Sequence, residues 1–397
     1  MREQPRVRPA GERLAATAPT PRIRLRNTAL DHRPIRLKAL THGLKTELIE
    51  TAEHGQIRSR EGSVEHVEVF RQMVSVRTSI IGRPRPSPSQ RRAHPTYPLN
   101  CEEPEILEPE NDELSERVYE ELAYREQVLD ARYPFELVSE YGKWALRRRA
   151  ADSEAEVAAH DCYICCLLIS AIHSELLPTK SDHEVFKSSA RALQVESYLT
   201  AAEVLGGRAY WFGFPRPDGS GMLKAIQNLT SLMGTAVAPE ERPVGLSANA
   251  ADGTVDIVAW RPFLDGQAAS IVAYGQVASG RNWTAKPIKS FIDGHFLPWF
   301  DKTPSHKHIE MLFVPFPQHH EQTEEKKLDF RAVASEKARL REKDYGVVID
   351  RLRLAELMAL SKVGGRYDKQ EYELHEDYLR TWVAGAFSYA EGTDVAA

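Results

Sequence analysis

Hydrophobic and polar positions follow different periods along the chain, and these periods divide it into parts. Residues 23–26 and 64–69 alternate with period two, which is typical of strands, so residues 23–82 are expected to form a small, basic, β-rich N-terminal module. Residues 1–22 are rich in Pro, Ala and Arg, which favours a disordered leader. Closely spaced prolines then indicate a linker at residues 83–113.

Helical patterns dominate the chain after the linker. They cover residues 114–129, 183–205, 223–233, 329–342 and 348–361. The second pattern stops at Gly206-Gly207, a common signal for the end of a helix. The stretch 163–169 is too uniformly apolar for a surface helix, so we expect it to be buried. Residues 363–397 are expected to form a tail or a further helix.

Strand-like runs lie between these helices. Residues 255–260 and 270–276 are apolar runs separated by Asp265-Gly266, a strong hairpin signal. A third run follows at residues 309–314. The mixture predicts an α/β fold with a mixed β-sheet flanked by helices. Within residues 114–362 we expect a helical part at 114–182 and a core at 183–318.

Composition limits the class of protein. Hydrophobic residues make up 42% and charged residues 27% of the 397 residues, an ordinary balance for a globular chain. No apolar run reaches 18 residues and no apolar segment follows the basic start, so we expect neither a membrane span nor a secretory signal. Four cysteines are too few for a disulfide scaffold, which favours a cytoplasmic location. Residues 1–99 hold 19 Lys and Arg against 9 Asp and Glu, a bias that suits a polyanion partner or a solvated leader.

The candidate chemistry lies on the predicted hairpin. Asp256 stands inside the apolar run Val255–Trp260, where a buried charge is costly unless it is paired or binds a cation. Gln276 places a carbonyl oxygen at the end of the next run. Each feature alone also fits a simple role, since acids and amides often cap strand ends. Together they describe an acid and an oxygen ligand on neighbouring strands.

This arrangement resembles the PD-(D/E)XK, or restriction-endonuclease-like, nuclease superfamily. The resemblance runs from about Tyr133 to Leu360 and matches Asp256 to the motif Asp and Gln276 to the motif Glu or Gln. It implies a nuclease core with Mg²⁺ or Mn²⁺ bound by Asp256, Gln276 and a backbone carbonyl near Val277. The motif lysine is missing, because Ala278 stands two residues after Gln276.

The resemblance also suggests residues that complete the site. Lys286 is the first candidate for a displaced lysine, with Arg281 and Lys289 as substitutes. The family commonly has a helix Glu before the sheet, and Glu184 is preferred over Glu196 and Glu203. For each Glu, a solvated helix face is the alternative. Arg261, Arg281, Asn282 and Trp283 are candidates for nucleic-acid contacts, although Trp283 suits a core position equally well.

The sequence therefore predicts a metal-dependent DNA endonuclease. The resemblance adds restriction or anti-phage defence, with a further protein subunit and a homodimer as expected partners. One alternative is a catalytically inactive, nuclease-like subunit that binds DNA or scaffolds a complex, because the motif lysine is absent. Another is an RNase on the same core. Zinc at His306, His308, His319 and His320 is disfavoured because no matching ligand spacing completes a site. Cys162, Cys165 and Cys166 are expected to act as small buried hydrophobes.

Overall fold

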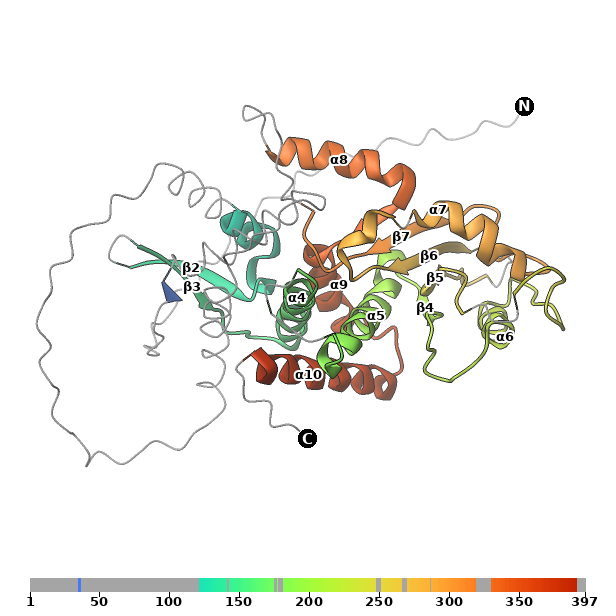
Figure 1. Cartoon of the computed structure of the whole chain (residues 1–397), viewed down its shortest axis with the longest axis horizontal. Helices are drawn as coiled ribbons and strands as arrows, with labels where there is room; N and C mark the ends of the chain where they lie inside the picture. Colours follow the sequence, from blue (N-terminus) through green and yellow to red (C-terminus); the bar gives the residue numbers. More distant parts are fainter. Residues whose placement is uncertain are drawn as a thin grey trace, which may run out of the picture. The chain divides into compact units, whose positions relative to one another are not determined.

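A mixed five-stranded sheet organises the computed structural model of the chain (Figure 1). The structure describes residues 35–36, 121–140, 143–174, 177, 181–247, 251–265, 270–285, 287–318 and 330–390. The strands are β4 (Arg208–Trp211), β5 (Ile257–Arg261), β6 (Ile271–Val277), β7 (Ile309–Phe313) and β8 (Val347–Ile349), in the spatial order β4-β5-β6-β7-β8. The first three are antiparallel neighbours, whereas β6, β7 and β8 run parallel. The α/β class and the mixed sheet predicted from the sequence are confirmed.

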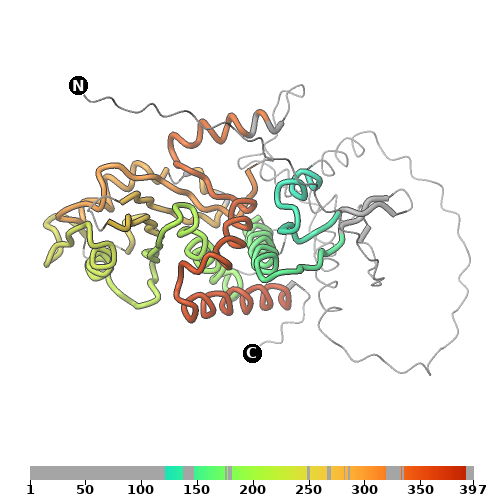
Figure 2. Tube along the Cα trace, turned by 180° about the vertical axis from the view of Figure 1, so that it is seen from behind, coloured from blue at the N-terminus to red at the C-terminus, as the bar shows by residue number. Residues whose placement is uncertain are grey.

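Helices cover both faces of this sheet. The long helices are α4 (Glu154–His173), α5 (Glu184–Leu205), α6 (Met222–Met233), α8 (Phe330–Tyr345), α9 (Arg351–Gly364) and α10 (Lys369–Ala390). Short helical turns are η1 (Asp130–Arg132), η2 (Arg281–Ala285), α7 (Ile288–Phe291), the π-helical η3 (Ile292–Phe296) and η4 (Leu297–Trp299), and residues 121–129 are also helical. Figure 2 shows from behind how α10 runs along the same side as α4 and α5, both of which it contacts.

The alternation of side chains along the strands builds two cores. On β5, Ile257 and Ala259 face a cluster formed with α4, α5, α9 and α10, whereas Val258 and Trp260 face a cluster formed with α6, α7 and η3. Because successive strand residues point to opposite faces, one apolar strand can serve both clusters. The continuous apolar run of β5 therefore follows from its burial between two helical layers.

Helix α4 supplies much of the first cluster. Its length and apolar composition would suffice to cross a membrane, yet 72% of its most apolar window is buried inside the fold, as in the core helices of soluble proteins. The buried Arg351 ties the start of α9 to α4, because it donates to Ser170 Oγ (2.8 Å) and to Pro315 O (2.9 Å). The expected burial of the apolar stretch is confirmed.

Some elements differ from the sequence predictions. The expected helix at 348–361 is two elements: strand β8 ends at Ile349, and α9 begins after Asp350, whose side chain caps it. A hairpin of β2 (Phe135–Glu140) and β3 (Lys143–Arg148) was not predicted. A three-residue strand and a hairpin with little alternation leave no clear period in the sequence.

The N-terminal predictions fall largely outside the described residues. This applies to the leader, to the alternating runs of the basic module and to the linker at 83–113. Within the basic module the structure describes only β1 (Ile35–Arg36), which pairs antiparallel with β3. The described residues all belong to one compact unit, Pro34–Ala397.

Candidate metal site at the entry to strand β5

Asp256 immediately precedes β5 and is held by backbone groups on both sides. Its N–H donates to Gly275 O (2.8 Å), and its carbonyl accepts from the N–H groups of Phe212 (2.8 Å) and Gly213 (2.7 Å). Its carboxylate Oδ2 accepts from Val277 N–H (2.8 Å). Asp256 therefore bonds to β6 on both sides of Gln276, and the residue, only 9% exposed, is fixed at the start of the inner strand β5.

A helix residue completes the support of this carboxylate. Gln194 of α5 donates from Nε2 to Asp256 Oδ1 (3.0 Å). A Cβ atom on Gly213 would lie 2.6 Å from Asp256 Oδ1 and 2.9 Å from Gln194 Nε2, so only glycine allows this approach. The amides of Val277 and Gln194 are neutral donors. These two hydrogen bonds orient the carboxylate.

Gln276 lies between the two β6 residues to which Asp256 bonds, and its side chain carries a further oxygen. Its side chain is 7% exposed, and within the described part of the chain its Oε1 is buried without a hydrogen-bond partner. Most buried polar atoms are satisfied, so an unpaired amide oxygen points to a ligand or an ion. Tyr274, two residues earlier on β6, is also buried, and burial raises the pKa of its hydroxyl well above the ordinary value. Its hydroxyl therefore stays protonated in alkaline buffers as well.

The turn that leads into Asp256 has an unusual backbone. Gly253 and Thr254 both have positive φ angles, 61° and 71°, and Thr254 is β-branched, for which this region is costly. Asp252 stabilises the turn, because its Oδ1 accepts from Thr254 N–H (2.8 Å). Such conformations persist where the surrounding structure requires them, often at functional sites. Here the turn sets the point at which Asp256 enters the sheet.

The structure separates one of the predicted catalytic residues, Glu184, from this arrangement, and it buries the position where the motif lysine is missing. Glu184 is exposed at the start of α5, ten residues before Gln194, which is about 15 Å along a helix. Ala278, at the position of the motif lysine, is 1% exposed and packs into an apolar cluster with Trp283 and Leu312. Lys286 lies outside the described residues, so its role stays a prediction. The same holds for the Val277 carbonyl as a ligand, since Val277 reaches Asp256 through its N–H.

The structure places one of the predicted nucleic-acid contacts, Arg261, away from Asp256. Arg261 is exposed at the opposite end of β5, where its Nη1 donates to Leu205 O (3.4 Å). Trp283 is buried with the Arg341 guanidinium 5.0 Å from its ring centre, which fits the core alternative. Asn282 is exposed in η2, whereas the side chain of Arg281 lies outside the described residues.

Sequence reasoning missed Gln194 and Gly213. Only acids were considered on the helix before the sheet, although Gln194 is a polar residue between Leu193 and Val195. Gly213 interrupts an aromatic run, and a glycine in or beside a strand often marks close backbone approach. Both signals were present, but neither identifies Asp256 as the contact.

Comparisons with protein-family models, with curated proteins and with solved structures found no match for this chain. Fold and site therefore define the class only as an α/β protein with a mixed sheet and an acid–amide pair on adjacent strands. The nuclease resemblance remains a prediction, and the function has to be argued from the geometry of the site.

Replacing Gln194 by Leu is expected to weaken metal-dependent activity about 10- to 100-fold, the usual effect of removing a group that orients a metal ligand. The variant removes the hydrogen bond to Asp256 Oδ1 but keeps a side chain of similar volume. Activity is measured as a function of metal concentration. A matched control is Gln227→Leu on α6, which removes the hydrogen bond that Gln227 Nε2 donates to Pro239 O. Equal metal dependence in the two variants would exclude a positioning role for Gln194.

Proposed function

We propose that this chain is a Mg²⁺- or Mn²⁺-dependent DNA endonuclease whose metal is held by Asp256 and Gln276. The observation that carries the proposal is the buried Gln276 Oε1, which has no hydrogen-bond partner in the described part of the chain, on the strand that also orients the Asp256 carboxylate. A carboxylate and an amide oxygen are ligands that a hard divalent cation prefers. The residues present therefore fit such an ion.

Hydrogen bonds from neighbouring residues orient the proposed metal ligand Asp256. Val277 N–H and Gln194 Nε2 fix the two Asp256 oxygens, so the carboxylate would keep its orientation when an ion binds. Preorganised ligands avoid reorganisation during the reaction. A bound Mg²⁺ supplies an activated water and stabilises charge on a phosphodiester. Gln in place of an acid lowers the negative charge of the site, which favours weak metal binding and a requirement for millimolar metal.

The second candidate is a nuclease-like subunit that binds DNA without cutting it. It is favoured by Ala278, because a buried methyl group occupies the position where the related motif has a lysine. Under this alternative the basic residues of the N-terminal part would carry salt-dependent DNA binding. Defence as the biological setting, a partner subunit and a homodimer are part of the proposal only through the family resemblance.

Supercoiled plasmid incubated with the full chain and Mg²⁺ or Mn²⁺ is expected to become nicked or linear, and EDTA should prevent this. Single-stranded DNA and tRNA are tested in parallel, because preferential cleavage of tRNA would support the RNase alternative. DNA binding is measured in the same buffers by a mobility shift. Binding without cleavage of any substrate, in either metal, would contradict the endonuclease proposal and support the non-catalytic subunit.

A further inference from the structure

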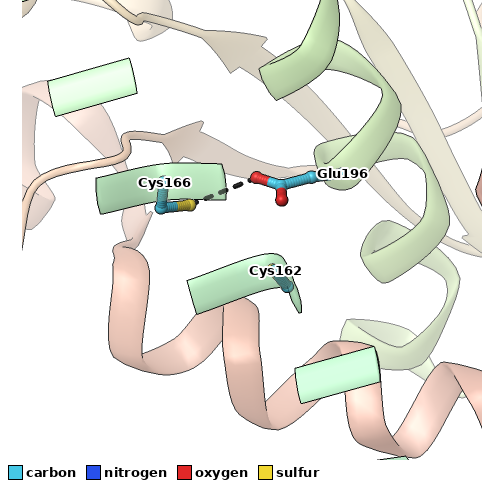
Figure 3. Close-up of side chains that lie close together, drawn as sticks. All are labelled: Cys162, Cys166 and Glu196. Atoms are coloured by element: carbon cyan, nitrogen blue, oxygen red, sulfur yellow. Dashed lines mark hydrogen bonds between the residues drawn. The ribbon is translucent and has the colours of Figure 1, made fainter. Parts of the chain in front are cut away.

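Three sulfur and oxygen ligands converge in the core between α4 and α5. Cys162 and Cys166 lie one turn apart on α4, and Glu196 reaches toward them from α5 (Figure 3). The three ligand atoms lie within 4.8 Å of one another, and Cys166 Sγ is 3.2 Å from Glu196 Oε2. All three residues are at most 2% exposed. Their sequence spacing gave no sign of this, because Glu196 comes from another helix.

Glu196 is the unusual member of this group. Its side chain is completely buried, and its Oε1 has no hydrogen-bond partner among the described residues. A buried carboxyl group with an unused oxygen is costly in an apolar core. The cysteines were expected to be simple hydrophobes, which would not require a carboxylate beside them. A carboxyl group beside two thiols is instead a set of ligands for a cation that binds both sulfur and oxygen.

We propose that Cys162, Cys166 and Glu196 form a binding site for Zn²⁺. Zinc accepts thiolate and carboxylate ligands, with Zn–S distances of about 2.3 Å that place two sulfurs about 3.8 Å apart in a tetrahedron. The observed separations are close enough that shifts of about 1 Å or less complete the site. Mg²⁺ prefers oxygen ligands, so this site is independent of the one at Asp256.

Charge also favours a divalent ion here. Two thiolates and a carboxylate carry three negative charges, which leaves one when Zn²⁺ is bound. The buried Arg351 guanidinium acts electrostatically on both Cys166 and Glu196, and its positive charge offsets the remainder. The protons of both thiols and of the Glu196 carboxyl, whose pKa burial raises to about 8, leave to solvent when the metal binds, so binding strengthens as pH rises.

A small cavity lies beside one of the three ligands. A cavity of ≈ 20 Å³ adjoins Cys162 between α4, α5, α9 and α10. Its lining includes the charged residues Asp161, Glu376 and Arg380. This volume is enough for a water molecule, which can serve as the fourth zinc ligand. Once bound, zinc would connect α4 to α5 and stabilise the helical layer behind the sheet.

The test uses the full-length chain, reduced and stripped of metal by a chelator. Adding Co²⁺, a spectroscopic substitute for zinc, is expected to produce a sulfur-to-cobalt charge-transfer band that saturates at one ion per chain. Excess Zn²⁺ should remove the band and raise the melting temperature. Cys162→Ser and Cys166→Ser are expected to weaken the band or abolish it. Cys101→Ser and Asp256→Asn, which leave the three ligands intact, should keep it.

Two results would overturn the proposal. The first is wild-type protein that shows no cobalt–thiolate band and, after denaturation, releases no zinc above a chelator-treated control. This measurement needs no variant and stays decisive if the buried substitutions prevent folding. The second is an unchanged band in folded Cys162→Ser and Cys166→Ser proteins. Because Asp256→Asn retains the band under the proposal, the zinc site and the nuclease activity can fail separately.

Discussion

The Asp256→Asn variant is expected to lose metal-dependent cleavage by about 10³-fold or more, which corresponds to about 4 kcal/mol of transition-state stabilisation. Asparagine has the same shape but no charge, and its single side-chain oxygen can still accept from Val277 N–H. The Gln194 amide can rotate to accept from the new NH₂ group, so the hydrogen bonds with Val277 and Gln194 need not be lost. The loss should therefore come from weaker metal binding.

The measurement is plasmid cleavage over a range of Mg²⁺ and Mn²⁺ concentrations, with a mobility shift for DNA binding. Asp377→Asn is the matched control, because Asp377 is exposed on α10 and contacts only Arg380 among the charged partners described for it. Its cleavage should equal that of the wild type. If Asp256→Asn folds, binds DNA and cleaves at the wild-type rate, Asp256 is not a metal ligand and the proposed function has to be abandoned.

The hairpin that carries this site was predictable because its signals are local. Two apolar runs, a turn signal and two interrupting polar residues lie within a short segment, and β5 and β6 pair antiparallel as expected. The end of α5 was also predictable from the sequence, because Gly206 adopts a φ of 61° and ends the helix after Leu205. Adjacent strands bring Asp256 and Gln276 together without any knowledge of the rest of the fold.

Contacts between distant segments were not predictable in the same way. Gln194 reaches Asp256 only because α5 packs on the sheet, and Glu196 meets two cysteines only because α4 and α5 lie side by side. From the helical pattern of the sequence alone, Glu184 and Glu196 cannot be distinguished, because both are acidic residues on the same helix. Burial separates them, since Glu184 is exposed and Glu196 is completely buried. Periodicity identifies the elements, whereas the partner of each polar residue depends on their packing.

The largest stability effect is expected from Gly207→Ala, which should lower the free energy of unfolding by about 3 kcal/mol or more. Gly207 follows the helix-closing Gly206 and lies directly against β5. A Cβ atom there would stand 2.1 Å from Trp260 O and 2.8 Å from Arg261 Cα. Both neighbours are backbone atoms of a strand, so they cannot move aside as a flexible side chain would. Relief requires separating β4 from β5 or unwinding the end of α5.

Urea denaturation measures this effect as a fall in the midpoint with an unchanged slope. Gly294→Ala is the matched control, because a Cβ at Gly294 meets nothing within 4 Å, and its effect should stay within about 0.5 kcal/mol. Equal midpoints for the two variants would mean that β5 does not approach Gly207 as described. Because β5 begins one residue after Asp256, a distorted β4–β5 pairing should also reduce cleavage, whereas Gly294→Ala should leave it intact.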